Sequence, residues 1–324
     1  MRQPLARWRH LSPSGRTMKI AVVGAGAIGG WVAAKLALAG EPVMALTSRG
    51  PLDRIALKEG GETQTHELAH FEGPADVLVI AVKATALAAA AQSARAFVGS
   101  DTMIVPMLNG VPWWFVENMQ LKSVDPDGSV AAALPFEQVV GCVVHASCSR
   151  FGETVVVKHA DKLIIGEPGG GETSERVARL FALFDEAGLK PDITANVRRS
   201  IWYKLWGNAT INPLSALTRA SCDKILADPE CRAWMVEGMT ELAMIGASVG
   251  CPITETAEDR MGVTARLGAF KTSMLQDVEA GRPIELEALL GAPREIGQAR
   301  SIATPALDRL YGVTKLMAQS LSLG

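Results

Sequence analysis

The sequence predicts an α/β protein in which a doubly wound parallel sheet is followed by an all-helical second domain. Three observations support this fold class. A glycine-rich motif near the start of the chain lies between a β-rich run and an apolar helical stretch. Short, fully apolar runs followed by polar residues recur in the first half, as is typical of buried parallel strands. From about Val197 onward the pattern is helical almost throughout.

Composition sets the limits of this prediction. The chain has 324 residues, with 48% apolar and 20% charged, which suits two globular domains with full cores. A net charge of −2 gives no indication of a nucleic-acid or membrane partner, and no apolar run reaches the roughly 18 residues that span a bilayer. The five cysteines form neither a CxxC pair nor a cluster with metal-ligand spacing. We therefore expect reduced thiols, no metal site and a cytoplasmic location.

Residues 1–17 are rich in arginine and lack the apolar centre of a secretory signal. A short mitochondrial-type presequence is compatible with their composition. We favour a disordered extension, with Met18 opening the folded protein. The expected domains are then a nucleotide-binding domain at 18–195 and a helical substrate domain at 196–324.

The glycine-rich motif has the spacing of the dinucleotide fingerprint G-x-G-x-x-G. Gly24 permits a tight turn, Gly26 lets the backbone approach a pyrophosphate, and Gly29 lets the helix pack on the strand. The N-terminus of that helix offers N–H groups to the phosphates. A glycine-rich turn without a ligand is the alternative. The expected cofactor-binding residues of a Rossmann-type loop are Gly24, Ala25, Gly26, Ala27, Ile28 and Gly29.

The end of the second strand bears on the choice of cofactor. It reads Thr47-Ser48-Arg49, without the carboxylate that NAD sites place there for the ribose hydroxyl. A hydroxyl and a guanidinium suit a 2′-phosphate instead, because arginine offers a planar fork of donors. We therefore expect Ser48 and Arg49 to bind NADP(H). For Arg49 the alternative is a solvated loop residue.

Two polar residues follow buried strands, where open α/β sheets bind ligands. Lys83 follows the apolar run 77–82, and Asn109 follows the run 103–107. We expect both to lie near the cofactor, although each could simply begin a surface loop.

The remaining elements are predicted from turns and caps. Residues 141–168 are expected to form a hairpin that extends the sheet, with a turn near Phe151-Gly152. Ser174 is expected to cap the next helix. The second half is expected to hold a long helix at 228–250 and a last helix that begins after Thr304.

Lys204, Asn208 and Asn212 interrupt a mostly apolar helical run at four-residue spacing, which places them on one helix face. Buried polar groups are costly unless they have partners, and a substrate in a cleft between the domains would be such a partner. A partly desolvated lysine releases a proton more easily near neutral pH. The alternative is a surface stripe, and these residues alone leave both interpretations open.

The chain resembles the ketopantoate reductases (2-dehydropantoate 2-reductases) from Met18 almost to its end. The Lys–Asn–Asn helix, followed by SMLQD and a later glutamate, is the specific part of the resemblance. The family implies a Rossmann domain and a helical domain of the 6-phosphogluconate dehydrogenase C-terminal type. The matching stretches occur in the family's order: GAGAIG at 24–29, VK at 82–83, NG at 109–110, YKLWGNATINPL at 203–214 and SMLQDVEAGRPIELEALLG at 273–291.

The resemblance implies NADPH-dependent reduction of the keto acid 2-dehydropantoate to pantoate, in pantothenate and coenzyme A biosynthesis. Lys204 would protonate the ketone oxygen as hydride arrives. Glu285 would accept a substrate hydroxyl or steer Lys204, unless it is only a carboxylate at a helix start. A homodimer is compatible with this prediction. Further implied contacts are Asn208, Asn212 and Ser273 to the substrate, Asn109 to Lys204 and the nicotinamide, and Lys83 near the cofactor.

Four positions depart from the family pattern: Glu287 stands in place of an aspartate, and three lost asparagines leave the substrate open. Leu290, Phe270 and Cys222 stand where other members carry asparagine. An enzyme that recognises substrate hydroxyls needs such amides. The alternatives are the same chemistry on another 2-keto or 3-keto acid, and an NADP(H)-binding sensor without turnover. The presence of both Lys204 and Glu285 argues against the sensor.

Overall fold

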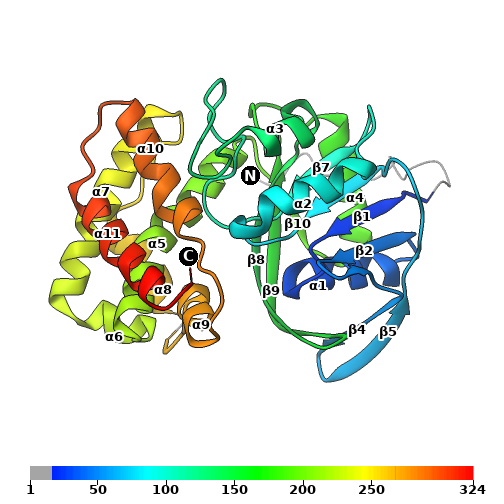
Figure 1. Ribbon diagram of the computed structural model, residues 1–324, viewed down its shortest axis with the longest axis horizontal. Coiled ribbons are helices and arrows are strands. Elements are labelled where there is room, and N and C mark those ends of the chain that lie inside the picture. Colours follow the sequence, from blue (N-terminus) through cyan, green and yellow to red (C-terminus); the bar gives the residue numbers. More distant parts are fainter. Residues whose placement is uncertain (1–16, 267, 324) are drawn as a thin grey trace. The chain divides into compact units, whose positions relative to one another are not determined.

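The structure is a computed structural model that describes residues 17–266 and 268–323 (Figure 1). Internal contacts divide the chain into two units, one within Met1–Leu108 and Ser129–Val197, the other within Asn109–Gly128 and Arg198–Gly324. This division differs from the expected one, because the segment Asn109–Gly128 joins the helical unit. The extension expected at the N-terminus lies, except for Thr17, outside the described residues.

The first unit contains a parallel sheet with the strand order β2-β1-β6-β7 and a short antiparallel β3 beside β2. Every residue of β1, β6 and β7 is buried, which explains their continuous apolar sequences. The expected Rossmann-type fold is confirmed. The strands are β1 (Ile20–Val23), β2 (Val43–Thr47), β3 (Gly50–Pro51), β6 (Val77–Ile80) and β7 (Met103–Pro106).

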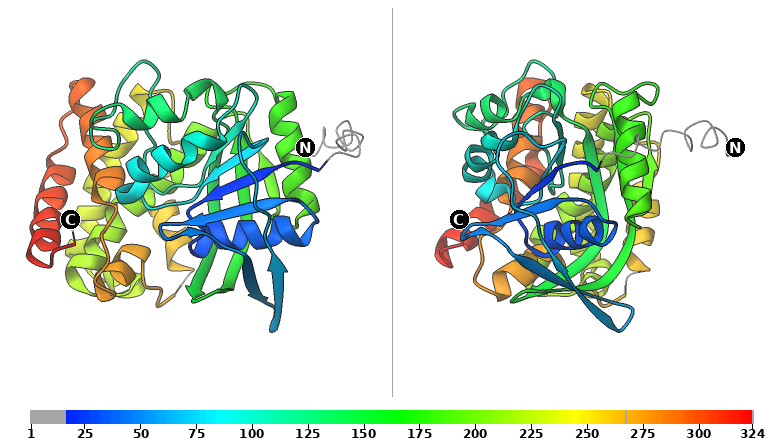
Figure 2. Two further views of the ribbon diagram at one scale, coloured as in Figure 1. Left: turned by 45° about the vertical axis from the view of Figure 1, so that its right-hand side comes forward. Right: turned by 90° about the vertical axis from the view of Figure 1, so that its right-hand side faces the viewer.

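Helix α1 (Ala27–Leu38) is apolar on all sides except at Lys35, and a helix of this kind has to be covered on most of its surface. One side packs on β1 and β2, and the other contacts β4 (Arg54–Glu59), β8 (Gly141–Phe151) and β9 (Thr154–Gly166). Figure 2 shows α1 between the two sheets. The opposite face of the parallel sheet carries α2 (Leu87–Ala94), which packs against α3 (Ser129–Ala133).

The hairpin β8–β9 turns at Phe151–Gly152 as predicted, but the expectation that it extends the parallel sheet is wrong. It belongs to a second sheet with the order β10-β9-β4-β5, in which β8 pairs with β9. The apolar outer face of α1 is the physical reason, because buried hairpin residues such as Val155 cover it. The added strands are β5 (Glu62–Glu67) and β10 (Pro191–Ile193).

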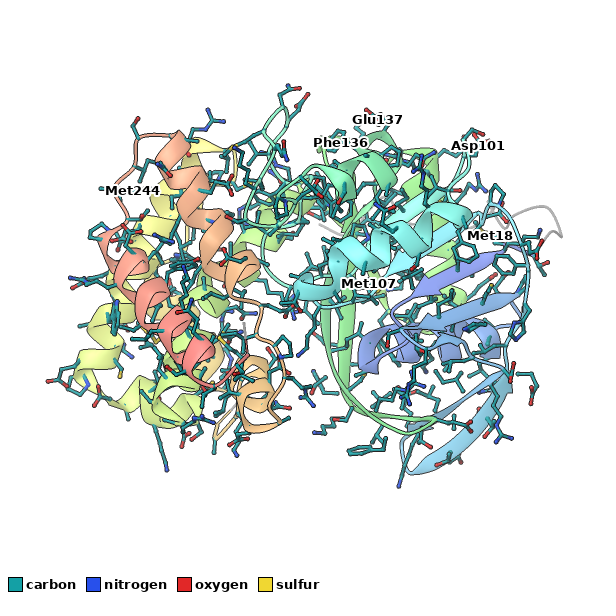
Figure 3. The ribbon with its side chains drawn as sticks, viewed as in Figure 1. Met18, Asp101, Met107, Phe136, Glu137 and Met244 are labelled. Atoms are coloured by element: carbon teal, nitrogen blue, oxygen red, sulfur yellow. The ribbon has the colours of Figure 1, made fainter. Side chains whose placement is uncertain are left out.

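Caps and short helices complete the first unit. The Ser174 side chain accepts a hydrogen bond from the Val177 N–H at 3.3 Å, which confirms it as the N-cap of α4 (Glu175–Glu186). Met18 is buried before β1, and its N–H donates to Glu41 at 2.7 Å. In Figure 3, Phe136 and Glu137 mark the exposed η4. The 3₁₀ helices are η2 (Ala84–Ala86), η3 (Arg95–Phe97) and η4 (Phe136–Gln138).

The second unit is helical, and its longest helices are joined by tryptophans. Trp202 and Trp206 of α5 donate from their indole N–H groups to carbonyl oxygens of α7 at 2.9 and 2.6 Å. These bonds give each buried indole N–H the hydrogen-bond partner that it needs away from water. The elements are α5 (Val197–Thr218), α6 (Cys222–Ala227), α7 (Pro229–Ser248), α8 (Ala257–Ala265), α9 (Ser273–Glu279), η5 (Glu287–Gly291), α10 (Ala292–Ala299) and α11 (Pro305–Ser320).

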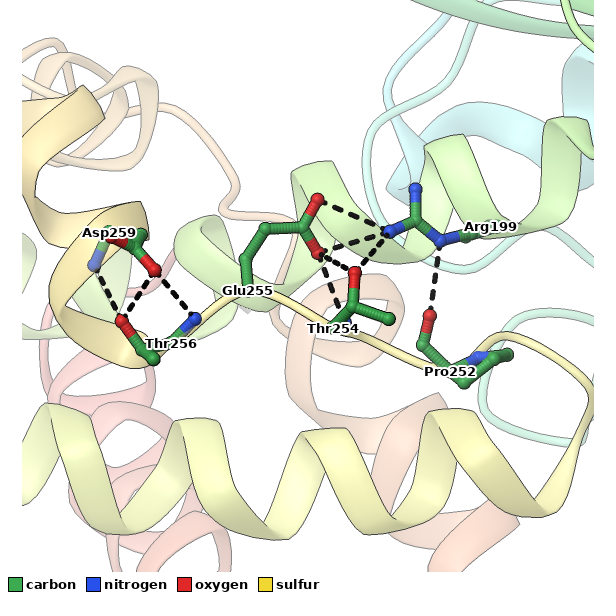
Figure 4. A network of polar contacts seen from close by, with 6 residues as sticks. All are labelled: Arg199, Pro252, Thr254, Glu255, Thr256 and Asp259. Carbon is green, nitrogen blue, oxygen red and sulfur yellow. Dashed lines mark hydrogen bonds and ion pairs between the residues drawn. The ribbon is translucent and has the colours of Figure 1, made fainter.

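The turn between α7 and α8 is held by the polar network of Figure 4. Thr256 and Asp259 form a reciprocal capping box at the start of α8. Arg199 of α5 binds the Glu255 carboxylate at 3.0 Å and the Pro252 carbonyl at 3.1 Å. The long helix expected at 228–250 is confirmed as α7, with Asp228 as its N-cap. Among the described residues, no helix has the length and apolarity needed to cross a membrane.

The segment Asn109–Gly128 joins this unit through aromatic packing. Phe115 is fully buried and stacks on Trp202 with ring centroids 5.4 Å apart. The Arg198 guanidinium also lies over the Phe115 ring, 5.6 Å from its centroid. These contacts bind the segment to the start of α5, which sequence order alone does not indicate.

Candidate active site

Three residues predicted to act together form one hydrogen-bonded chain in the helical unit. The Lys204 Nζ donates to the Asn109 Oδ1 at 3.0 Å. The Asn109 Nδ2 in turn donates to the Glu285 Oε2 at 3.3 Å. Glu285 is 8% exposed, so its carboxylate depends on such partners rather than on water.

The two flanking charges determine which way the Asn109 amide points. Its oxygen faces an ammonium group and its nitrogen faces a carboxylate. The reversed amide would set donor against donor and acceptor against acceptor, because lysine only donates and an ionised carboxylate only accepts. Lys204 and Glu285 therefore hold Asn109 in one orientation, and Asn109 links them.

The position of Asn109 depends on the glycine that follows it. Gly110 has φ +79°, and a Cβ atom there would lie 2.4 Å from the Ala288 carbonyl oxygen. The next residue, Val111, donates its N–H to the same oxygen at 2.8 Å. Only glycine allows this approach, which fixes Asn109 against η5.

Glu285 lies directly before the first turn of the helix that contains η5, so it stands at a helix start and also in the polar chain. The η5 segment is a π-helix. Pro293 follows it, and a proline has no N–H to donate to the carbonyl four residues earlier. π-Helical turns of this kind are frequent at functional sites.

The rest of the polar stripe lies on α5 as predicted. Lys204 and Asn208 are half-buried, and Asn212 is buried. Ser273 is exposed at the first position of α9, where Thr272 is the cap and accepts from the Leu275 N–H at 3.1 Å. The substrate contacts expected of Asn208, Asn212 and Ser273 stay predictions.

The glycine-rich loop of the first unit has the shape that a pyrophosphate needs. Gly24 has φ +96°, and a Cβ atom on Gly29 would lie 2.2 Å from the Gly24 carbonyl oxygen, so both positions require glycine. A Cβ atom on Gly26 would meet nothing closer than 3.9 Å, which leaves the outer side of the loop open. Gly26 is the N-cap of α1 and, as a glycine, offers no side chain to the first N–H groups of the helix, which suits an anion there.

The other predicted cofactor residues lie in the same unit. Ser48 and Arg49 are exposed just beyond β2, and the Arg49 N–H donates to the Thr47 hydroxyl at 3.2 Å. Lys83 is half-buried and precedes η2. Their cofactor contacts, and that of Asn109, stay predictions. In the described part of the chain, no cluster of three or more His, Cys, Asp or Glu side chains could hold a metal ion.

One arginine at the loop is absent from the sequence predictions. Arg150 of β8 donates from its Nη1 to the Ala25 carbonyl oxygen, across a separation of 125 residues. No local pattern marks this residue, because it lies within an ordinary strand far from the loop in sequence.

A glycine-rich nucleotide loop in one unit and a Lys–Asn–Glu chain in the other are the parts of a nicotinamide-dependent oxidoreductase. The family model described as Ketopantoate reductase PanE/ApbA matches residues 20–169. The model of the C-terminal part of the same family matches residues 196–318. The chain belongs to the ketopantoate reductase family.

Individual relatives extend over nearly the whole chain. The 2-dehydropantoate 2-reductase of Mesorhizobium japonicum is 36% identical and is matched over 93% of this chain and 98% of its own. A structure from Ralstonia solanacearum MolK2, attributed to a ketopantoate reductase, has 42% identity and a TM-score of 0.88, covering 95% and 100% of the two chains. The 2-dehydropantoate 2-reductase of Methylococcus capsulatus has 29% identity and a TM-score of 0.80, covering 95% and 99%.

Proposed function

We propose that this protein is an NADPH-dependent 2-dehydropantoate 2-reductase, which converts ketopantoate to pantoate in pantothenate biosynthesis. The hydrogen-bonded chain Lys204–Asn109–Glu285 is the observation that carries the proposal. It provides a positioned proton donor in a unit that belongs to the ketopantoate reductase family.

The cofactor would be held by the glycine-rich loop at 24–29, by Arg49 and by Lys83. The open side of Gly26 and the start of α1, whose N-cap is this glycine, suit the pyrophosphate. When bound, NADPH supplies the hydride for the ketone carbon. The remaining steps depend on residues of the helical unit.

Lys204 donates the proton that the ketone oxygen needs as the carbon–oxygen double bond is reduced. One proton of its Nζ is engaged with the Asn109 Oδ1 at 3.0 Å, which limits the directions in which the ammonium can point. A positive charge held near the oxygen also stabilises the negative charge that develops there. Proton donation and charge stabilisation thus come from one group.

Glu285 acts on this donor through Asn109 and also offers a carboxylate to the substrate. Its Oε2 accepts from the Asn109 Nδ2 at 3.3 Å, which keeps the amide oxygen turned toward Lys204. A carboxylate that is 8% exposed favours a hydroxyl group that can donate a hydrogen bond to it. Asn208, Asn212 and Ser273 would bind the remaining polar groups of the keto acid.

The test is a steady-state assay that follows the loss of NADPH absorbance with ketopantoate. For Lys204→Ala we expect a fall in rate of about 10²-fold or more, the range for a positioned general acid. Lys224→Ala is the matched control, since that lysine is exposed on α6 of the same unit. A Lys204→Ala enzyme with the wild-type rate would refute the assigned role of this lysine.

A second candidate is the same reduction on another 2-keto or 3-keto acid. The Cys222 N–H donates to the Phe270 carbonyl oxygen at 2.9 Å, so these two departures from the family pattern alter one place rather than two. The third, Leu290, is buried in η5. Binding of NADPH without turnover of ketopantoate would favour this candidate, and a panel of keto acids would then identify the substrate. Inactivity toward the whole panel would favour a sensor.

A cytoplasmic location and a homodimeric assembly stay predictions. Light scattering coupled to size-exclusion chromatography tests the assembly directly, because it gives the mass of the particle independently of its shape. Cell fractionation tests the location.

A further inference from the structure

Arg150 is built into the edge of the glycine-rich loop by the second sheet. Its Nε donates to the Gly152 carbonyl oxygen at 2.9 Å, and its Nη1 donates to the Ala25 carbonyl oxygen. Both acceptors are neutral, so the bonds orient the guanidinium without compensating its charge. The side chain is partly buried, which limits how far water can compensate this charge.

The position of this guanidinium is set by the packing of the β8–β9 hairpin against α1. Arg150 is paired in register with Val155 of β9. A Cβ atom on Gly30, in the first turn of α1, would lie 2.8 Å from the Val155 side chain. The hairpin therefore contacts the start of α1 directly, and Arg150 is carried to the loop by that contact.

The surroundings of Arg150 are positively charged. Burial lowers the pKa of Arg150, and the nearby Arg49 lowers it further, while Glu153 acts in the opposite direction. Glu153 accepts a hydrogen bond from the Arg54 Nε at 3.0 Å, so only part of its charge offsets that of Arg150. The N-terminus of α1 adds a partial positive charge at the same loop. Like charges collected in this way raise the free energy of the protein until an anion joins them.

We propose that Arg150 is a second guanidinium for the 2′-phosphate of NADPH, acting together with Arg49. This inference rests on the proposed function, which makes NADPH the cofactor. The pyrophosphate is the natural ligand of the loop N–H groups, and both cofactors carry one. A phosphate monoester brings about −1.5 to −2 of charge, which two planar guanidinium groups match. Arg150 would therefore distinguish NADPH from NADH.

The experiment measures cofactor binding without keto acid. Dissociation constants of NADPH, NADH, adenosine 2′,5′-bisphosphate and AMP are measured by calorimetry for the wild type, Arg150→Met and Arg150→Lys. We expect Arg150→Met to weaken the two 2′-phosphorylated ligands by about 10- to 100-fold, as for a lost charge-assisted bond. Binding of NADH and AMP should change by less than about twofold, and Arg150→Lys should recover part of the loss.

Arg179→Met is the matched control, because Arg179 lies exposed on α4 of the same unit. It should leave all four dissociation constants unchanged. Equal weakening of NADPH and NADH by Arg150→Met would mean that Arg150 only clamps the loop, and would overturn the proposal. Unchanged NADPH binding would also overturn it. Inactivity of the wild type toward ketopantoate would count against the proposed function and not against this role of Arg150.

Discussion

The Asn109 side-chain oxygen accepts a hydrogen bond from the Lys204 ammonium at 3.0 Å, across a separation of 95 residues. The same amide donates to Glu285, so removing it breaks both connections at once. We therefore expect Asn109 to act as a positioning residue for Lys204, the proposed proton donor. Substituting Asn109 tests how much the position of Lys204 contributes to the rate, because Lys204 itself is kept.

For Asn109→Ala we expect kcat to fall by about 10²-fold, since a small displacement of a reacting group has an effect of this size. Steady-state assays with NADPH and ketopantoate measure it. The control is Asn118→Gly, because Asn118 lies exposed on the same segment and its φ of 57° suits glycine. Wild-type kcat in Asn109→Ala would show that Lys204 needs no partner for its position.

Gly110→Ala should destabilise the protein by about 2 kcal/mol or more, because alanine is strained at φ +79° and would meet the Ala288 carbonyl. Gly312→Ala is the opposite case, since its added Cβ atom meets nothing within 4 Å in the middle of α11. It should stabilise the protein by about 0.5–1 kcal/mol. Urea denaturation measures both changes, and equal effects would contradict the close approach at Gly110.

Glu241→Ala should cost about 3 kcal/mol of unfolding free energy, because the buried carboxylate accepts the Ala306 and Leu307 N–H groups at 2.7 and 3.0 Å. Those donors open α11, whose N-cap Thr304 makes no side-chain capping bond. Glu237→Ala, on the same helix α7, removes an exposed pair with Arg309 and should cost less than about 1 kcal/mol. A small loss in Glu241→Ala would mean that water replaces the carboxylate.

Glu167 should make stability depend on pH. Burial by itself raises the pKa of Glu167, but hydrogen bonds from Arg176 and Ser174 outweigh it and lower the pKa from its ordinary 4.5. A carboxylate with a depressed pKa stabilises the fold above its unfolded pKa, and this contribution disappears as the pH falls through the folded pKa. Glu167→Gln should therefore be less stable than the wild type at pH 7.

The difference in unfolding free energy between Glu167→Gln and the wild type should shrink steadily below about pH 4.5, as linkage requires. Urea denaturation at pH 7, 4 and 3 follows it. Glu172→Gln, in the exposed turn before α4, should show no such trend. A difference that stays constant down to pH 3 would show that the ion pair with Arg176 does not set the stability.

Local rules made several features predictable from sequence. The positive φ of Gly24 and the approach of Gly29 to the Gly24 carbonyl are local, and the Ser174 cap follows from one hydrogen bond to the next turn. The stripe of Lys204, Asn208 and Asn212 follows from helix periodicity alone. Family resemblance, rather than periodicity, connected that stripe with Glu285.

The sequence by itself determined the Rossmann-type loop, the helical second half and the residues from which a proton donor could be chosen, because these depend on short-range geometry. Tertiary structure decided that Asn109 belongs to the helical unit, that the β8–β9 hairpin covers α1, and that Arg150 reaches Ala25. The physical reason is that each of these depends on which apolar surface must be covered: Phe115 against Trp202, and Val155 against α1. Such contacts join residues far apart in the chain, and no local pattern specifies them.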